Sequence, residues 1–227
     1  MSIQKAHGFV VFADADLANA AETIAITGFF NAGQDCTAAT RVIVEESVYD
    51  EFVGLLAAQA KGLQTGAPSE EDVLFGPVNN ANQLARVTGF LSDVPSHAKV
   101  VAGGKQVARD GFFIEPTVIA DLKQGDRHIQ EEIFGPAAVL QTFINDDDAV
   151  RKINKSRFGL GCSVWTLDAS RFNNLSSRID TGNVFLNSMV RSHVGLPYGG
   201  VKDSGYGREL GEEGLRELTN IKVVYTG

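Results

Sequence analysis

Hydrophobic residues occur along this chain in short runs, separated by stretches in which they recur every three or four positions. The runs at residues 8–12 and 41–44 consist mainly of aromatic and β-branched residues, which favour buried β-strands. Between these runs, apolar residues at helical spacing follow Asp14 or Asp16, and either aspartate can cap a helix that ends near Gly28. The first quarter of the chain therefore predicts a strand, a helix and a second strand.

The same alternation continues to the end of the chain. Further strands are expected at residues 99–101, 114–119, 161–166, 184–186 and 221–225, and further helices at 52–59, 77–93, 146–154, 169–179 and 211–218. Ser47 and Asp50 precede the helix at 52–59 with the spacing of a capping box. Alternating strands and helices predict an α/β fold with an open, largely parallel sheet flanked by helices.

The glycine-rich stretch at 196–207 is the one plausible boundary in this pattern. It divides the chain into a large domain at residues 8–204, which contains the candidate chemistry described below, and a C-terminal helix and oligomerisation strand at 205–227. The last expected strand, at 221–225, has no evident partner in its own neighbourhood. Because an unpaired edge strand readily pairs with another chain, the sequence predicts a homodimer or a larger homo-oligomer.

Composition narrows the classes of function. The net charge is −8, from 28 acidic and 20 basic residues, so no basic face for nucleic acid or for a membrane surface is expected. The first residues do not resemble a signal peptide, and no apolar stretch has the length needed to span a bilayer. Two cysteines make no disulfide framework, which favours a reducing cytoplasm. The four histidines are too scattered to predict a metal site.

Cys36 is the candidate nucleophile. It follows a glycine-containing turn, and Thr37, Ala38 and Ala39 after it are expected to form a small-residue helical turn. A thiol at a helix N-terminus has a lowered pKa, and the helix N–H groups there can stabilise an oxyanion. The alternative is a small buried hydrophobic residue, which is the commoner role of a cysteine outside a disulfide. Cys162, within a strand-like run, is expected to fill that second role.

Three motifs in order give the chain a resemblance to a known family. Asn-Ala-Gly-Gln-Asp-Cys at 31–36 resembles the active-site cysteine motif of the aldehyde dehydrogenase superfamily, and Glu-Glu-Ile-Phe-Gly-Pro at 131–136 resembles its second signature. Asn187, followed by Pro-Tyr-Gly-Gly-Val-Lys-Asp-Ser-Gly-Tyr-Gly-Arg-Glu-Leu at 197–210, resembles its C-terminal signature. The resemblance runs from about Phe9 to the end of the chain. It implies oxidation of an aldehyde to a carboxylate with NAD or NADP, through a cysteine thiohemiacetal and a thioester.

The resemblance also implies roles for single residues. Cys36 matches the nucleophile that attacks the aldehyde. Glu132 matches the residue that hydrogen-bonds the nicotinamide ribose, and Phe134 matches the aromatic residue that positions the nicotinamide. Tyr198 and Phe30 match aromatic residues that line the aldehyde tunnel.

Two substrate classes remain open. Asp35 and Phe30 resemble aminoaldehyde-oxidising members, whose pockets suit a cationic amine near acids and aromatic rings. Residues 197–210 resemble members that oxidise succinate semialdehyde, and there Arg191 and Ser192, in the loop at the tunnel mouth, could hold a carboxylate. Those semialdehyde enzymes often place a basic residue where this chain has Phe30.

The chain departs from the family pattern at its start. The family has Glu-Leu-Gly-Gly-Lys before the run at 9–12, and its glutamate is the general base, but Ser2 and Ile3 stand at the first two of those positions. The cofactor domain and an oxyanion-hole asparagine are expected still earlier, and Gly205 and Gly207 do not complete a dinucleotide fingerprint. We therefore expect a catalytic half without the N-terminal cofactor domain, inactive by itself and without tight cofactor binding. The alternatives are a silent fragment that acts only through oligomerisation, and a thioester hydrolase, for which no histidine follows at a suitable distance.

Overall fold

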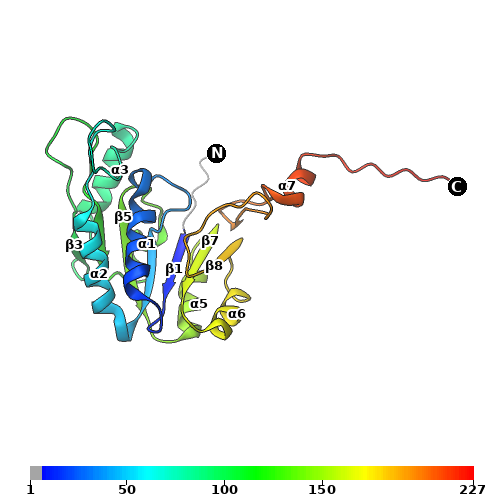
Figure 1. Ribbon diagram of the computed structural model, residues 1–227, viewed down its shortest axis with the longest axis horizontal. Coiled ribbons are helices and arrows are strands. Elements are labelled where there is room, and N and C mark those ends of the chain that lie inside the picture. The colour runs from blue at the N-terminus through cyan, green and yellow to red at the C-terminus, as the bar shows by residue number, and fades with distance from the viewer. Residues whose placement is uncertain (1–6) are drawn as a thin grey trace.

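The computed structural model describes residues 7–227, and its centre is a seven-stranded sheet (Figure 1). The strand order is β3-β4-β5-β2-β1-β7-β8, and all neighbours are parallel except β3 and β4. The strands are β1 (His7–Val11), β2 (Arg41–Glu45), β3 (Lys99–Ala102), β4 (Thr117–Ala120), β5 (Ala137–Phe143), β7 (Gly161–Trp165) and β8 (Asn183–Leu186). The open, largely parallel α/β sheet predicted from the sequence is confirmed.

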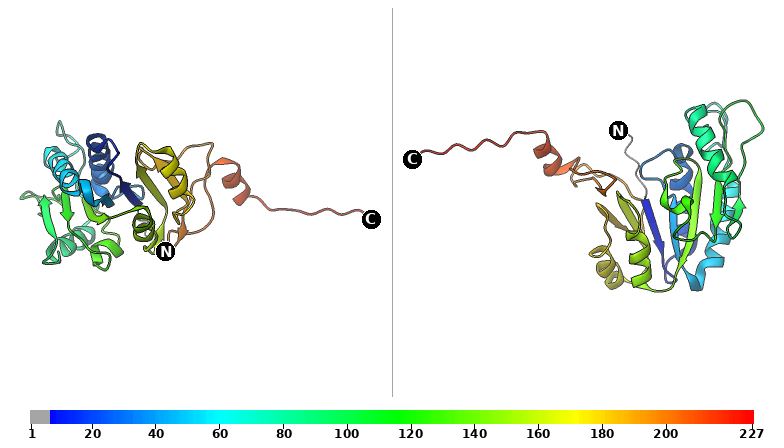
Figure 2. Two further views of the ribbon diagram at one scale, coloured as in Figure 1. Left: turned by 90° about the horizontal axis from the view of Figure 1, so that it is seen from below. Right: turned by 180° about the vertical axis from the view of Figure 1, so that it is seen from behind.

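Helices cover both faces of this sheet (Figures 1 and 2). Side chains alternate along a strand, so Phe9 and Val11 of β1 face one core and Val10 and Phe12 face the other. The first core contains residues of α1 (Leu17–Phe29), α2 (Tyr49–Gly62) and α3 (Ala81–Ser92), and the second contains residues of α5 (Asp146–Asn154) and α6 (Ala169–Ser176). A strand buried on both faces has to be apolar throughout, which explains the uninterrupted run at 8–12. No helix within residues 7–227 is long and apolar enough to cross a bilayer.

The capping residue was predicted correctly for α1 but not for α2. Asp16 caps α1, because its carboxylate accepts a hydrogen bond from the Asn19 N–H at 3.1 Å. The helix predicted at 52–59 is found within α2, but its predicted capping box is not formed: α2 begins at Tyr49 after a short 3-10 turn, η2 (Glu46–Val48), and its N-cap Val48 makes no side-chain hydrogen bond. Ser47 instead donates to the Glu45 carboxylate at 3.3 Å.

Four further elements differ from the sequence prediction. Helix α3 begins at Ala81 rather than at residue 77, because Asn80 caps it by accepting from the Gln83 N–H at 2.9 Å. Strand β4 begins only after Pro116, which has no N–H to give to a ladder. Strand β5 has no counterpart among the elements expected from the sequence, and neither does the short helix α4 (Arg127–Gln130).

The C-terminal part departs from the sheet. Strands β6 (Phe158–Gly159) and β9 (Val201–Lys202) form a small antiparallel pair, and the chain continues through α7 (Gly211–Glu217) as an extended segment that leaves the body (Figure 1). The strand expected at 221–225 is not formed in this chain. No strand within residues 7–227 lies beside that segment to supply ladder hydrogen bonds, and Ile221 is 94% exposed.

Candidate functional site

Cys36 lies in the loop that joins α1 to β2, at the amino-terminal edge of the sheet. Strand β2 lies between β1 and β5 and is parallel to both. The segments that precede these three strands therefore meet at one edge, and they include both the Cys36 loop and the motif at 131–136. Open parallel sheets more often place ligands at the carboxyl edge, so the arrangement here is the reverse.

The loop begins with three consecutive residues in the left-handed conformation. Within the 3-10 segment η1 (Phe30–Gly33), Asn31, Ala32 and Gly33 have φ values of 53°, 57° and 66°. Such a conformation is unfavourable for a residue like Ala32, and it persists only where the surroundings impose it. A Cβ atom on Gly33 would lie 2.1 Å from the carbonyl oxygen of Gly135, so only glycine fits. The first motif is thus packed directly against the second.

The structure corrects the prediction about the environment of Cys36. No helix follows it: Cys36 and Thr37 form a turn, and irregular chain leads from there to β2 at Arg41. The Asp35 carboxylate accepts hydrogen bonds from both the backbone N–H and the hydroxyl of Thr37, each at 2.7 Å. The argument that a helix N-terminus activates the thiol is therefore wrong for this protein.

Two side chains of α3 hold the turn that contains Glu132 and Phe134. The Gln83 amide donates to the carbonyl oxygens of Ile133 at 3.1 Å and of Phe134 at 2.6 Å, and the Arg86 guanidinium donates to the carbonyl of Glu132. Phe134 itself has a φ of 56°, so the turn is another enforced conformation. Sequence reasoning missed Gln83 and Arg86, whose only signal was their spacing of three on one face of a predicted helix.

The same helix also fixes the Cys36 loop. The Gln34 amide donates to the side-chain oxygen of Asn79 at 3.2 Å, and the Asn79 backbone N–H donates back to Gln34 at 2.9 Å. Asn79 directly precedes Asn80, the N-cap of α3. The start of α3 therefore connects the two motifs and sets Glu132 and Phe134 beside the loop of Cys36.

A cavity of about 350 Å³ opens between Cys36 and the C-terminal signature. Its lining includes Tyr198 and most of the glycine-rich segment at 199–209, together with Leu160 and Glu217. Strand β6 directly precedes β7 and pairs with β9 of the C-terminal signature. Both β6 and β9 therefore lie at the same edge of the sheet as Cys36. The sheet topology thus explains why Cys36 and Tyr198, which are 162 positions apart in the sequence, line one cavity.

Backbone hydrogen bonds hold Tyr198 in this lining. Its backbone exchanges two hydrogen bonds of 2.7 Å with Glu209, and the next residue, Gly199, accepts from the Asn183 amide at 3.0 Å. Its hydroxyl oxygen is buried and has no hydrogen-bond partner among residues 7–227. Burial raises the pKa of the Tyr198 phenol, and the negative charges of Cys36, Asp35 and Glu209 raise it further. The phenol is therefore protonated at neutral pH and able to donate.

A second cavity, of about 220 Å³, also has Tyr198 in its lining, together with Arg191 and His193. The structure thus brings Cys36, Asp35 and Tyr198 together, and it brings Arg191 to Tyr198. Ser192 is exposed and lines neither cavity, and Phe30 is 55% exposed at the start of the Cys36 loop and also lines neither.

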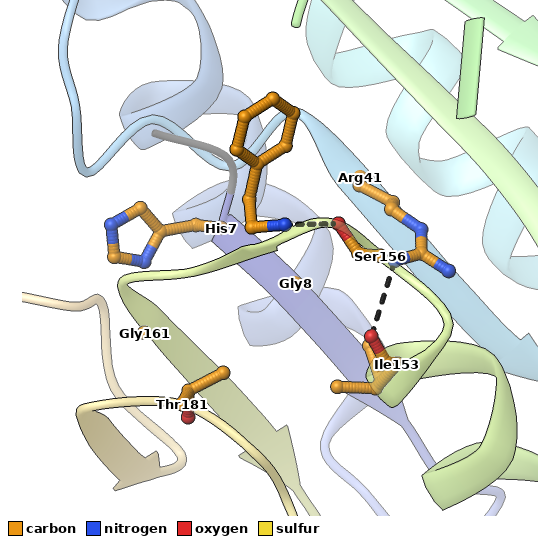
Figure 3. Close-up of a pocket in the computed structure, with 8 residues that line it drawn as sticks. His7, Gly8, Arg41, Ile153, Ser156, Gly161 and Thr181 are labelled. Atoms are coloured by element: carbon orange, nitrogen blue, oxygen red, sulfur yellow. Dashed lines mark hydrogen bonds between the residues drawn. The ribbon is translucent and has the colours of Figure 1, made fainter. Parts of the chain in front are cut away.

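A third cavity, at the amino ends of β1, β2 and β7, is too small for a substrate. Figure 3 shows Arg41 beside Ile153 and Ser156 on one side of it and His7 on the other. Its volume of about 10 Å³ is that of one water molecule. Arg41 donates to the backbone oxygens of Ile153 and Lys152, at 3.4 and 2.5 Å. Burial lowers the pKa of Arg41 to about 10, against the opposing influence of Cys162. Arg41 therefore anchors β2 to the end of α5.

Cys162 is wholly buried in the second core, as expected, and burial raises the pKa of its thiol to about 12. Its thiolate is therefore scarce at neutral pH. Ser2, which stands where the family has its general base, lies outside the described residues. Within residues 7–227, no group of three or more histidine, cysteine, aspartate or glutamate side chains is placed to hold a metal ion.

Comparison with known proteins agrees with the motifs. Residues 6–224 match the sequence model of the aldehyde dehydrogenase family. Succinate-semialdehyde dehydrogenase (NADP+) 1 from Mycobacterium tuberculosis is 41% identical over 219 residues, which is 96% of this chain and 48% of that protein. Human retinal dehydrogenase 2 is 40% identical over 216 residues, 95% of this chain and 42% of that protein.

The fold matches solved structures as well. Betaine aldehyde dehydrogenase from Staphylococcus aureus in complex with NAD+ superposes with a TM-score of 0.89 at 32% identity, over 93% of this chain and 43% of that one. The chain therefore spans about half the length of the relatives that it matches.

Proposed function

The chain belongs to the aldehyde dehydrogenase family, and from this premise we propose that Cys36 is the nucleophile of an enzyme that oxidises aldehydes with NAD or NADP. The observation that carries the proposal is the position of Cys36. The Cys36 loop packs against the turn of Glu132 and Phe134, and Cys36 itself lines a cavity of about 350 Å³. A nucleophile, an adjacent cavity and a preformed turn for a cofactor are the parts that such a reaction needs.

The reaction begins when the Cys36 sulfur attacks the aldehyde carbon. The carbon–sulfur bond forms, the carbonyl π bond breaks, and the thiol proton ends on the oxygen to give a thiohemiacetal. The Cys36 backbone N–H is one donor for the oxyanion that forms on the way. Water then hydrolyses the thioester that follows oxidation, which releases a carboxylate and restores the thiol.

Glu132 and Phe134 are the residues that would hold the nicotinamide end of the cofactor. A carboxylate can accept both ribose hydroxyls, and the turn that carries it is fixed by Gln83 and Arg86. The chemistry that a bound NAD or NADP supplies is acceptance of the two electrons lost in forming the thioester. Relatives are named for NADP+ or solved with NAD+, so either dinucleotide suits the proposal.

The rest of the proposal concerns turnover, association and location. A polypeptide of these 227 residues alone should give negligible NAD(P)-dependent turnover, because it supplies only the nicotinamide half of a cofactor site. Turnover of propanal above that of a Cys36→Ala control would contradict this expectation. The alternative is a catalytically silent chain that acts through oligomerisation. A cytoplasmic location completes the proposal, since two cysteines in 227 residues make no disulfide framework.

The chemistry of Cys36 can be tested without a cofactor, because thiohemiacetal formation needs no electron acceptor. Alkylation of the folded protein by iodoacetamide at pH 7.5, followed by mass spectrometry of each cysteine, should label Cys36 and leave Cys162 almost unlabelled. Millimolar aldehyde should slow the labelling of Cys36 reversibly. Equal labelling of the two cysteines, or no protection of Cys36 by any aldehyde, would show that Cys36 is not the nucleophile.

A further inference from the structure

The helix expected after Cys36 is not formed, and carboxylates lie around its thiol instead. Asp35 directly precedes it, Glu209 and Glu217 line the same cavity, and Glu132 belongs to the turn that packs against its loop. Negative charges nearby disfavour a further negative charge on the sulfur. A thiolate at Cys36 therefore needs a hydrogen-bond donor close to it.

Four side chains in the cavity lining besides Cys36 can donate a hydrogen bond. The Arg208 guanidinium is already bound to two backbone carbonyls, at 2.9 and 2.7 Å. The Ser204 hydroxyl is held by a backbone N–H at 3.0 Å, and the Tyr206 side chain is fully exposed to water. Tyr198 differs from these three, because its hydroxyl is buried and bonds to no group within the described part of the chain. A buried donor without an acceptor is unfavourable, so the Tyr198 hydroxyl is the donor most in need of one.

The charges that act on the Tyr198 hydroxyl place it near Cys36. Burial is the main cause that raises the pKa of this phenol, and the negative charge of Cys36 comes next, ahead of those of Asp35 and Glu209. Because such an effect weakens with distance, the hydroxyl lies close to the sulfur. Two backbone hydrogen bonds of 2.7 Å between Tyr198 and Glu209 fix the segment from which the ring projects. The hydroxyl therefore keeps its proton beside a thiolate.

We propose that the Tyr198 hydroxyl donates a hydrogen bond to the Cys36 sulfur when the thiol ionises, and so stabilises the nucleophile. The thiol proton leaves to water, and the phenol keeps its own. A neutral thiol is only a weak acceptor, and hydrogen bonds of a catalytic site often tighten only when the reacting form is present. This explains why the hydroxyl has no partner in the structure.

The inference rests on the proposed function of Cys36 and adds a catalytic residue to it. The resemblance implies only that the Tyr198 ring lines the aldehyde tunnel, a role that phenylalanine could fill equally well. The hydrogen bond to sulfur requires the hydroxyl.

The test is the pH dependence of Cys36 alkylation by iodoacetamide in the wild type and in Tyr198→Phe. The sulfur–carbon bond forms as iodide leaves, so the rate follows the fraction of thiolate. Tyr198→Phe removes only the hydroxyl and should move the midpoint of the rate profile upward by about one pH unit. Below both midpoints the rate at Cys36 should fall about tenfold, whereas above both midpoints the two proteins should react within about twofold of each other.

Two further variants separate the hydrogen bond from a general loosening of the site. Asp35→Asn keeps an oxygen that can accept from Thr37 but removes the negative charge beside the sulfur, so it should move the midpoint downward by about half a pH unit. Tyr49→Phe removes a hydroxyl outside the cavity lining, which accepts from the Asp121 N–H at 2.7 Å, and should leave the midpoint unchanged.

The outcomes separate this inference from the proposed function. An unchanged midpoint in Tyr198→Phe, or an equal rise in Tyr49→Phe, would overturn the role of the hydroxyl and leave Cys36 as the nucleophile. An upward shift in both Tyr198→Phe and Asp35→Asn would overturn it as well, because loosening alone would then account for the change. Failure of every aldehyde to protect wild-type Cys36 would instead overturn the reaction proposed at Cys36.

Discussion

Large hydrophobic side chains are mostly buried in the α/β body, residues 7–204, and mostly exposed in the C-terminal arm, residues 205–227. In the body, large side chains such as Phe9 and Phe52 are wholly buried between the sheet and its helices. In the arm, Leu218 and Val224 are 88% and 76% exposed, and neither touches a core. Burial of apolar surface is the main force that stabilises a fold. The body therefore supplies its own stability, whereas the arm does not.

The backbone shows the same contrast. Each strand of the body's large sheet is paired, and only β3 and β8 lie at its edges. Near its end the arm carries the segment Ile-Lys-Val-Val-Tyr at 221–225, which pairs with no strand among residues 7–227. An apolar segment of high β-propensity with unsatisfied backbone groups is suited to pairing with a second chain. We therefore propose that the arm acts in a homodimer or a larger homo-oligomer.

The largest effect expected from this contrast is on the free energy of unfolding. Phe52→Ala in α2 leaves a cavity in the main core and should lower that free energy by about 3–5 kcal/mol. Leu218→Ala in the arm should change it by less than about 0.5 kcal/mol. Urea unfolding followed by circular dichroism at one low protein concentration measures both. Equal losses would mean that the arm is part of the folded core.

The next effect concerns association. Light scattering should give a mass above the 24.3 kDa of one chain, and Val224→Lys should return it toward that value. A buried ammonium without a partner costs several kcal/mol, and a loss of about 2 kcal/mol already corresponds to about a thirtyfold rise in the dissociation constant. Ile144→Lys, at a body position that is 65% exposed, is the matched control and should leave the mass unchanged. A wild-type protein that is already a monomer at moderate concentration would refute the role given to the arm.

The sequence was sufficient where the structure depends on neighbours in the chain. The helix at 146–154 is found as predicted, because Asn145 accepts from the Asp148 N–H and the acidic first turn suits the helix dipole. Strand β5 was missed because its sequence, Ala-Ala-Val-Leu-Gln-Thr-Phe, has no clear alternation of apolar and polar residues. It becomes a strand because β2 and β4 both pair with it.

In the candidate site, too, the sequence identified some residues and missed those that hold them in place. The motifs identified Cys36, Glu132 and Phe134 by resemblance, but the residues that hold them make contacts over 45 to 51 positions of sequence. No local spacing shows such a contact. The turn at Cys36 was mistaken for a helix start because Thr37, Ala38 and Ala39 suit both. The Asp35 carboxylate decides for the turn by binding the Thr37 N–H.

The smallest expected effect separates the support of the site from the core of the body. Gln83→Leu removes both hydrogen bonds to the carbonyls of Ile133 and Phe134, and it should lower the free energy of unfolding by about 1–2 kcal/mol. The loss is smaller than that of a core aromatic residue, because each hydrogen bond replaces one to water. Gln59→Leu, at an exposed position of α2, is the matched control and should change the free energy by less than about 0.5 kcal/mol. If Gln83→Leu were no more destabilising than Gln59→Leu, the turn of Glu132 and Phe134 would keep its shape without α3, and the connection that α3 makes between the two motifs would not stabilise the site.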